Sequence, residues 1–236
     1  TKAVINTVKE LLPGGKVHEK YLYKLQQIAD MAKACIGADG KLVPIIFRPF
    51  HEMEGGWFWW GRPHRTPEEF IALWRFTVEY LRDNLEVHNF LYAFSPDCKF
   101  FTREEYLIDY PGDNYVDVVG MDNYWDFRPD GANDQVLAGK KIKIVSDLAQ
   151  EKGKIAAMTE TGLESIPDSS WFTKKLMPVL QYGGSKIAYV MLWRNDNRMK
   201  HHFYAPYPGH ASVPDFLKFY NEAYTLFEND LKGIYK

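Results

Sequence analysis

The sequence has 236 residues and a mass of 27.5 kDa, a length typical of one large domain, and its 46% hydrophobic and 25% charged content excludes collagen-like and disordered chains. Its 29 basic and 31 acidic residues leave a net charge of −2 without a Lys/Arg-dense stripe, which excludes the usual electrostatic pattern of a nucleic-acid-binding protein. The longest apolar stretch near a predicted strand, Ile187 to Trp193, is far shorter than the ~20 residues of a membrane-spanning helix, so we expect no membrane span.

Apolar periodicity and capping signals divide the chain into alternating helices and strands. Residues 18–36 repeat apolar side chains at spacings of three and four, and residues 66–69 read as a capping box that starts another helix. Short, near-continuous apolar runs between the helices are typical of buried parallel strands. In chain order, the expected elements are helix 18–36, strand 43–47, a helix starting at 66, strand 90–94, helix 102–110, strand 116–121, helix 140–152, strand 155–158, helix 170–182, strand 187–193 and helix 214–231.

This alternation predicts an α/β fold with a parallel sheet. The strand starts are separated by roughly 30 residues or more, as βα units require. No strand is followed by GxGxxG or GxxxxGK[ST], so a dinucleotide-binding or phosphate-binding fold loses its main support.

Every expected strand leads into polar residues at its carboxyl end. The strand-end groups are Arg48, His51 and Glu52 after the first strand, Ser95 and Asp97 after the second, Asp122, Asn123 and Tyr124 after the third, Glu160 after the fourth, and Arg194, Asn195 and Asp196 after the fifth. In a (β/α) barrel, the loops at this face form the active-site pocket. The pattern therefore predicts a barrel with a polar pocket.

Two of these strand-end residues, Glu52 and Glu160, are the candidate catalytic pair. Glycosidic bond cleavage requires one carboxylic acid to protonate the leaving oxygen and a second carboxylate to act as a nucleophile or as a base for water. The loop around Glu52 contains Trp57, Phe58, Trp59 and Trp60 between glycines, and aromatic faces suit the apolar faces of sugar rings. A cleft of this composition indicates a polysaccharide or oligosaccharide substrate.

The segment from Arg48 to Gly61, together with the motifs at 122–124, 159–162 and 193–194, resembles glycoside hydrolase family 26, chiefly β-mannanases. The resemblance implies a (β/α)8 TIM barrel in which Glu52 is the acid/base and Glu160 is the nucleophile of a retaining reaction. It also implies a hydrogen bond from Tyr124 to the nucleophile. The sugar-binding residues that it implies are Arg48, His51, Trp57, Asp122, Tyr124, Trp193 and Arg194.

The chain departs from the family pattern at its amino end. If residues 43–47 form the fourth barrel strand, residues 1–42 contain only a connecting segment and one helix. Five strands cannot close an eight-stranded barrel. We therefore expect residues 1–236 to form the carboxyl-terminal part of a glycoside hydrolase catalytic domain, with strands 4 to 8 present and strands 1 to 3 absent from this chain.

Several residues also have a plain structural interpretation. An isolated Glu160 would be a surface carboxylate, Glu54 competes with Glu52 as the acid/base or is a solvated loop charge, and at least one tryptophan of the loop packs in the core. His201, His202 and His210 match no metal-binding spacing, so we expect no metal and no other cofactor. Cys98 is not paired with a histidine by any motif and is expected to be a buried thiol.

The leading hypothesis is retaining endo-hydrolysis of β-1,4-mannosidic bonds in mannan, glucomannan or galactomannan. Two alternatives stay open: hydrolysis of mixed-linkage β-glucan or β-1,3-xylan by the same glutamates, and glycan binding without cleavage. Because polysaccharides do not enter a cytoplasm, we expect a secreted, periplasmic or cell-surface protein, although no signal segment is visible. We expect it to act as a monomer.

Overall fold

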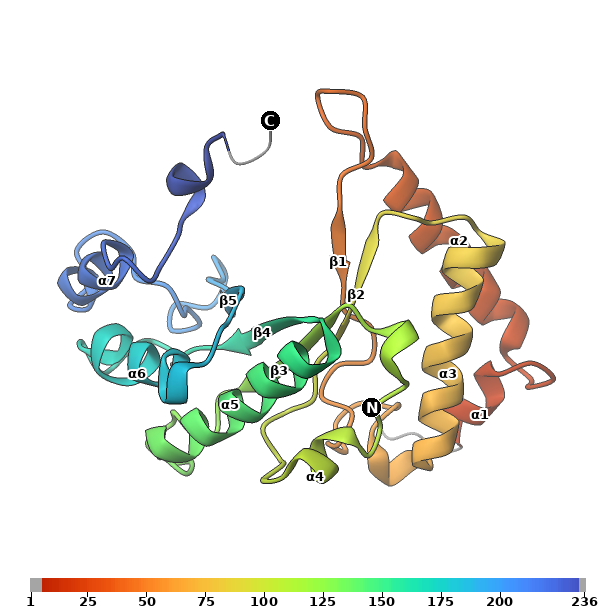
Figure 1. The fold of residues 1–236 in the computed structure, drawn as a ribbon, viewed down its shortest axis with the longest axis horizontal. Coiled ribbons are helices and arrows are strands. Elements are labelled where there is room, and N and C mark those ends of the chain that lie inside the picture. The colour runs from red at the N-terminus through yellow and green to blue at the C-terminus, as the bar shows by residue number, and fades with distance from the viewer. Residues whose placement is uncertain (1–5, 234–236) are drawn as a thin grey trace. The chain divides into compact units, whose positions relative to one another are not determined.

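A computed structural model of the chain describes residues 6–233. Residues 1–5 and 234–236 of the expected catalytic domain lie outside the described residues. The chain forms two compact units: a first unit that extends to Asp122 and includes Ile144–Ala157, and a second unit of Asn123–Lys143 together with the chain from Met158 onward. Figure 1 shows the order of the elements along the chain.

Strands and helices alternate as the sequence predicts. The strands are β1 (Ile45–Phe47), β2 (Phe90–Phe94), β3 (Val118–Asn123), β4 (Ile155–Thr161) and β5 (Tyr189–Leu192). The α-helices are α1 (Thr7–Leu11), α2 (His18–Ala34), α3 (Pro67–Glu79), α4 (Arg103–Leu107), α5 (Gln135–Lys152), α6 (Met177–Leu180) and α7 (Val213–Tyr220). The short helix α1 was not predicted, because five residues carry too little periodicity to be recognised.

The five strands form one sheet in the order β1-β2-β3-β4-β5. Strands β1 and β2 are parallel with Ile45 opposite Phe90, and β2 and β3 are parallel with Ala93 opposite Val118. Each strand therefore pairs with the next strand along the chain, with helical connections between them. This arrangement confirms the α/β class and fits part of a (β/α)8 barrel.

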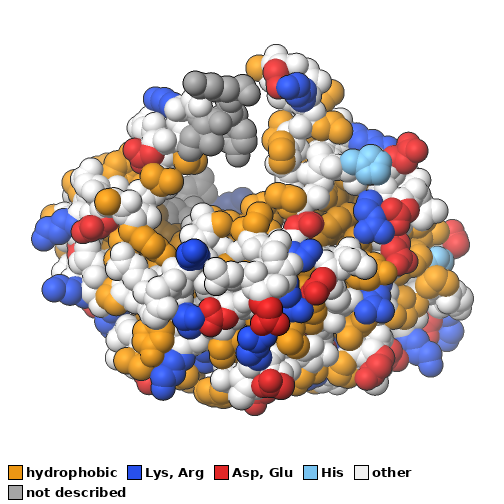
Figure 2. All heavy atoms as spheres, viewed as in Figure 1, with side chains coloured by type: hydrophobic (Ala, Val, Ile, Leu, Met, Phe, Trp, Pro, Cys, Tyr) orange, Lys and Arg blue, Asp and Glu red, His pale blue; other side chains and the backbone are white. Residues whose placement is uncertain are grey.

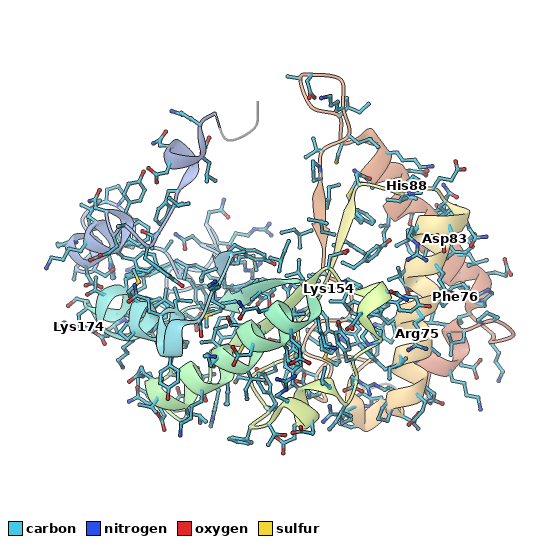
Figure 3. The ribbon with its side chains drawn as sticks, viewed as in Figure 1. Arg75, Phe76, Asp83, His88, Lys154 and Lys174 are labelled. Carbon is cyan, nitrogen blue, oxygen red and sulfur yellow. The ribbon has the colours of Figure 1, made fainter. Side chains whose placement is uncertain are left out.

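Helix α3 shows why the local predictions succeed. The Thr66 hydroxyl accepts from the Glu69 N–H at 3.3 Å, and the Glu69 carboxylate accepts from the Thr66 N–H at 2.9 Å, which completes the capping box. The neighbouring residues Arg75 and Phe76 serve different contacts (Figure 3): the Arg75 Nε donates to the Pro111 carbonyl at 2.7 Å, whereas the Phe76 ring contacts α2 residues. Within the first unit, helix α3 thereby contacts both the segment at Pro111 and helix α2.

Two predicted helices differ from the structure. The expected helix 214–231 ends at Tyr220, because the Thr225 hydroxyl donates to the Phe219 carbonyl at 2.7 Å and the chain turns there; a separate 3₁₀ turn covers Glu228–Leu231. The expected helix 170–182 is a π-helical turn at Phe172–Leu176 followed by α6. Proline 178 is the second residue of α6, and a proline has no N–H to continue the regular ladder.

The expectation that all strands are buried is wrong for β1 and β5. Ile46 in β1 is 46% exposed and Met191 in β5 is 36% exposed, whereas every residue of β3 is buried. Within residues 6–233, β1 and β5 are the two ends of the sheet order, so each pairs with one described strand. An apolar run in the sequence does not distinguish an edge strand from a central one.

The surface carries mixed charge. Figure 2 shows Lys/Arg and Asp/Glu side chains interspersed on the face that it displays, in keeping with the net charge of −2. No helix within residues 6–233 combines the length and the apolar content that crossing a membrane requires.

Candidate functional site

The loop after β1 carries Glu52 in a fixed backbone conformation. Glu52 has φ 52°, a left-handed value that is costly for a residue with a side chain, and its N–H donates to the Ser95 carbonyl at 2.9 Å. Two glycines allow the loop to fold tightly. A Cβ at Gly55 would lie 2.3 Å from the Trp57 ring, and one at Gly61 would lie 1.8 Å from the Gly55 carbonyl oxygen. The Gly-bracketed aromatic sequence thus specifies this turn.

The side chain of Glu52 is held by the aromatic loop. The Trp57 indole Nε1–H donates to the Glu52 carboxylate at 2.8 Å, and the Trp57 ring is 42% exposed. The Lys99 ammonium lies 4.3 Å from the centre of the same ring. Trp59 and Trp60 are instead partly buried against an apolar cluster, as expected for packing residues. Trp57 is therefore the tryptophan of this loop that combines an accessible face with a bond to a candidate catalytic carboxylate.

Glu54 is not the solvated charge that one sequence interpretation allowed. Its carboxylate accepts from the Asp97 N–H at 3.0 Å. Burial is the main cause that raises the pKa of Glu54 to about 8, and the neighbouring Asp97 carboxylate raises it further. The hydrogen bonds to Glu54 and the charge of Arg62 lower the pKa, but they do not offset the effect of burial. At neutral pH this carboxyl therefore retains its proton, and it adds no negative charge beside Glu52.

Three strand-end residues of the first unit form a polar network. The Arg48 guanidinium donates to the Asp122 carboxylate at 2.8 Å and to the Ser95 hydroxyl at 3.2 Å, and Ser95 donates to Asp122 at 2.7 Å. Asp122 is fully buried. His51 lies on the same loop as Glu52, with its ring 4.8 Å from Phe58. The structure thus joins Arg48 to Asp122, two of the predicted sugar-binding residues.

The buried guanidinium of Arg65 forms hydrogen bonds to the loop that carries Glu52. Arg65 donates to the Met53 carbonyl at 3.0 Å and to the Trp60 carbonyl at 3.0 Å, and it forms an ion pair with Asp109. Arg62 donates to the same carboxylate at 2.7 Å. The side chains of Arg65 and Asp109 are at most 1% exposed. These contacts tie both ends of the aromatic loop to one point.

In the second unit, Glu160 lies near the end of β4 and is 4% exposed. The Tyr124 hydroxyl donates to the Glu160 carboxylate at 2.8 Å, which is the hydrogen bond that the resemblance implied. The Tyr204 ring packs edge-on against the Tyr124 ring at 6.0 Å. Gly162, with φ 140°, permits this approach, because a Cβ there would lie 2.5 Å from Tyr204. Glu160 is thus a buried carboxylate beside two partly buried tyrosines.

Glu160 lines a cavity of about 510 Å³ that is formed within the second unit. Its other walls include Tyr124, Arg128, Glu164, Trp193 and Tyr204. This volume is within the range of small-molecule sites, and its mixture of aromatic and charged side chains suits a ligand rich in hydroxyl groups. The sequence identified Glu160, Tyr124 and Trp193 but not Tyr204, which lies in a long loop without a motif.

The chain around Tyr124 rests on a second buried ion pair. The Lys141 ammonium donates to both oxygens of Asp126, at 2.8 and 3.2 Å, and the Asn123 amide donates to Asp126 at 2.9 Å. The Thr161 hydroxyl donates to the Asn123 carbonyl at 2.7 Å and thereby links the ends of β3 and β4. Tyr124 is held between these contacts.

Trp193 and Arg194 follow β5 in sequence. The Trp193 N–H donates to the Thr161 carbonyl at 3.0 Å, which places Trp193 on the cavity wall. The Arg194 guanidinium lies 5.9 Å from the centre of the Trp193 ring and 3.5 Å from the Asp196 carboxylate. The second unit therefore groups Tyr124, Glu160 and Trp193 about one cavity, with Arg194 beside it.

The histidines considered as metal ligands have other partners. His202 is hydrogen-bonded to Glu164, and the His210 Nδ1 lies 2.8 Å from the Ser212 hydroxyl. Cys98 is buried, as predicted.

Comparisons with known proteins show the family to which the chain belongs. The family model described as Glycosyl hydrolase family 26 matches residues 1–175. This chain belongs to glycosyl hydrolase family 26. The family assignment made on the motifs alone is confirmed.

A mannan endo-1,4-β-mannosidase of Bifidobacterium adolescentis is 39% identical over 227 residues, which cover 89% of this chain and 22% of that protein. The solved structure of GH26C from Muricauda sp. is 45% identical with a TM-score of 0.92, covering 98% of this chain and 62% of that one. That of a GH26 β-mannanase from Bacteroides ovatus is 39% identical with a TM-score of 0.92, covering 100% and 67%. The chain thus spans about a fifth of the curated relative and close to two thirds of these solved structures.

Proposed function

We propose that the protein hydrolyses internal β-1,4-mannosidic bonds of mannan, glucomannan or galactomannan. The observation that carries the proposal is Glu160: a nearly buried carboxylate that accepts a Tyr124 hydrogen bond and lines a cavity with Trp193 and Tyr204. Membership of family 26 supports the same conclusion, since relatives such as that of Bifidobacterium adolescentis are named mannan endo-1,4-β-mannosidases.

In the proposed mechanism, the Glu160 carboxylate attacks the anomeric carbon while Glu52 donates its proton to the leaving glycosidic oxygen. The product is a mannosyl ester of Glu160 and a shortened glycan. Glu52, now a carboxylate, takes a proton from water, which attacks the anomeric carbon and releases Glu160. Two inversions give overall retention of configuration.

The hydrogen-bond donors beside the two carboxylates fit these roles. Tyr124 donates to Glu160, and this bond positions the carboxylate and stabilises its charged form. The Trp57 indole orients Glu52 while it leaves an aromatic face accessible to a sugar ring. We propose that Arg48, His51, Trp57 and Asp122 from the first unit, and Tyr124, Trp193 and Arg194 from the second, contact the glycan.

The finer organisation is proposed on the order of the motifs. Strands β1 to β5 correspond to strands 4 to 8 of a (β/α)8 barrel, and residues 1–236 belong to a single catalytic domain. The protein works as a monomer outside the cytoplasm, where polysaccharides occur, without a metal or other cofactor.

The test uses Glu160→Ala and Glu52→Ala with an activated aryl β-mannoside. Each variant loses nearly all turnover of mannan, by a factor on the order of 10⁴ or more. Added azide restores glycosyl transfer in both variants, with an α-mannosyl azide product from Glu160→Ala and a β-mannosyl azide product from Glu52→Ala. These opposite anomers separate the nucleophile from the acid/base.

Glu54→Gln is the matched control, because it changes a neighbouring carboxyl that the mechanism does not use, and it retains the wild-type kcat. Normal turnover by Glu160→Ala rejects the mechanism. A substrate panel decides between the glycans: preferred hydrolysis of mixed-linkage β-glucan or β-1,3-xylan rejects the mannan assignment. Binding of mannan without release of reducing sugar rejects hydrolysis altogether.

A further inference from the structure

The long loop after β5 contains a histidine that the proposed mechanism does not use. The His202 ring lies between a cation and an anion: the Arg194 Nε is 3.1 Å from His202 Nε2, and His202 Nδ1 is 2.6 Å from the Glu164 carboxylate. The His202 side chain is 17% exposed, which is far less than the 55% of Glu164 and the 54% of Arg194. The ring is therefore the enclosed member of a three-residue chain.

The chemistry of its two partners fixes the tautomer of His202. A guanidinium has only N–H donors, so the His202 Nε2 must offer a lone pair to Arg194. A carboxylate only accepts, so the proton resides on Nδ1 and is donated to Glu164. This chain of hydrogen bonds exists only while the imidazole is neutral.

The same histidine adjoins the cavity. Its ring packs edge-on against Tyr204 at 5.4 Å, and Tyr204 in turn contacts Tyr124, the hydrogen-bond donor to Glu160. Arg194 directly follows Trp193, another wall of the cavity. His202 thus connects the orientation of Arg194 to the cavity wall.

We propose that His202 is a positioning residue that holds the Arg194 guanidinium in the orientation that binds sugar hydroxyls. The inference rests on the proposed function, in which Arg194 contacts the glycan. A proton on Nε2 would place an N–H against the Arg194 N–H and a positive charge beside the guanidinium. Arg194 then has to turn away, and glycan binding weakens.

The charged groups around the His202 ring come from the segments after β3, β4 and β5. Glu164, which follows β4, receives the Nδ1 proton in both charge states. Arg194 opposes a second proton, and Asp196 pairs with Arg194 at 3.5 Å and keeps the guanidinium near the loop. From the segment after β3, Arg128 faces Tyr204 and Glu164 and adds positive charge.

The experiment measures kcat and KM for a linear manno-oligosaccharide at one pH. His202→Leu raises KM about tenfold, the loss expected when a hydrogen bond to a charged group is broken, and kcat is preserved. His202→Gln can still accept from Arg194 through its amide oxygen, so it keeps a KM near that of the wild-type protein.

Two controls make the result specific. His201→Gln changes the exposed neighbouring histidine and retains the wild-type KM. In an Arg194→Met background, His202→Leu raises KM no further, because the residue through which it acts is gone. A wild-type KM in His202→Leu, or a KM in His202→Gln as high as that of His202→Leu, overturns the inference.

A second readout separates this inference from the proposed function. Titration calorimetry with the same oligosaccharide gives the dissociation constant of each variant without any hydrolysis. If the wild-type protein binds but does not cleave, the hydrolytic function fails while a tenfold loss of affinity in His202→Leu still supports the positioning role. If cleavage is normal and the affinities are equal, the positioning role fails and the function stands.

Discussion

Glu52 and Glu160 are held in different ways. Glu160 is part of β4, 4% exposed, and its place is set by the backbone of a strand. Glu52 is on a loop with a left-handed backbone, where its N–H donates to the Ser95 carbonyl and its carbonyl accepts from the Gly55 N–H. A strand orients a side chain through many repeated hydrogen bonds, whereas this loop depends on a few.

Each unit also has a buried ion pair near its glutamate, and the two ion pairs contact different parts of the chain. In the first unit, the Arg65–Asp109 pair reaches the carbonyls of Met53 and Trp60 within the loop that carries Glu52. In the second unit, Lys141–Asp126 braces the turn that carries Tyr124, the partner of Glu160, rather than Glu160 itself. The comparison indicates that loss of support disturbs Glu52 directly and Glu160 only through its hydrogen-bond donor.

The largest expected effect comes from breaking these pairs. Asp109→Asn leaves Arg65 buried without its counter-charge, and Asp126→Asn does the same to Lys141, so each lowers the free energy of unfolding by about 3–5 kcal/mol. Urea unfolding measures both. Hydrogen exchange then locates the damage: amides of residues 50–61 exchange faster in Asp109→Asn, and amides of residues 123–134 exchange faster in Asp126→Asn.

The control is Asp83→Asn, in an Arg82–Asp83 pair whose side chains are 39% and 54% exposed. It leaves stability nearly unchanged, since exposed ion pairs contribute little. Equal stability losses without the unit-specific exchange would show that the pairs support the protein in general and not these two segments.

The next effect tests the hydrogen-bond donors. Tyr124→Phe removes the buried donor to Glu160 and lowers kcat by about 10²-fold, as for other preorganised donors. Trp57→Phe removes the donor to Glu52, but Trp57 is 42% exposed and water replaces its N–H, so kcat falls only about tenfold. Steady-state kinetics on one manno-oligosaccharide compares them. A larger loss for Trp57→Phe contradicts the distinction between a buried and a solvated carboxylate.

The sequence predicted the features whose signals are local. Strand β2 has the predicted bounds, and the capping box at Thr66 forms as expected, because each depends on residues within a few positions. The strand-end residues could also be predicted from the sequence, because parallel strands align their carboxyl ends. Glu52, Glu160 and Tyr124 were identified for this reason.

Features set by distant contacts were not predictable. Arg65 and Asp109 are 44 positions apart and match no motif. The hydrogen-bond chain through His202 joins segments after two different strands, and the spacing of the histidines in the sequence matches no motif that would predict it. The end of α7 was misplaced because the Thr225 hydroxyl that stops it looks like any other polar residue in a helical pattern.

The last prediction concerns Glu54, the other carboxyl of the loop. Burial is the main cause that raises its pKa to about 8, from 4.5 in an unperturbed side chain. Between these values the unfolded chain has lost the proton while the folded protein keeps it, so the folded state binds more protons. The stability that protonated Glu54 contributes is therefore fully present below about pH 4.5, and this contribution is lost as the pH rises toward about 8.

Glu54→Gln keeps the shape and the acceptor oxygen but does not titrate, so it removes this pH dependence. Urea unfolding at intervals between pH 5 and pH 8 should give a smaller decline in stability for Glu54→Gln than for the wild-type protein, and the variant should be the more stable of the two near pH 8. Glu19→Gln, at an exposed site on α2, is the matched control and keeps the wild-type slope. Parallel curves for the wild-type protein and Glu54→Gln would mean that Glu54 is charged at neutral pH. Glu52 would then share its loop with a second negative charge, and the loop would resemble an ordinary solvated surface more than the enclosed β4 site.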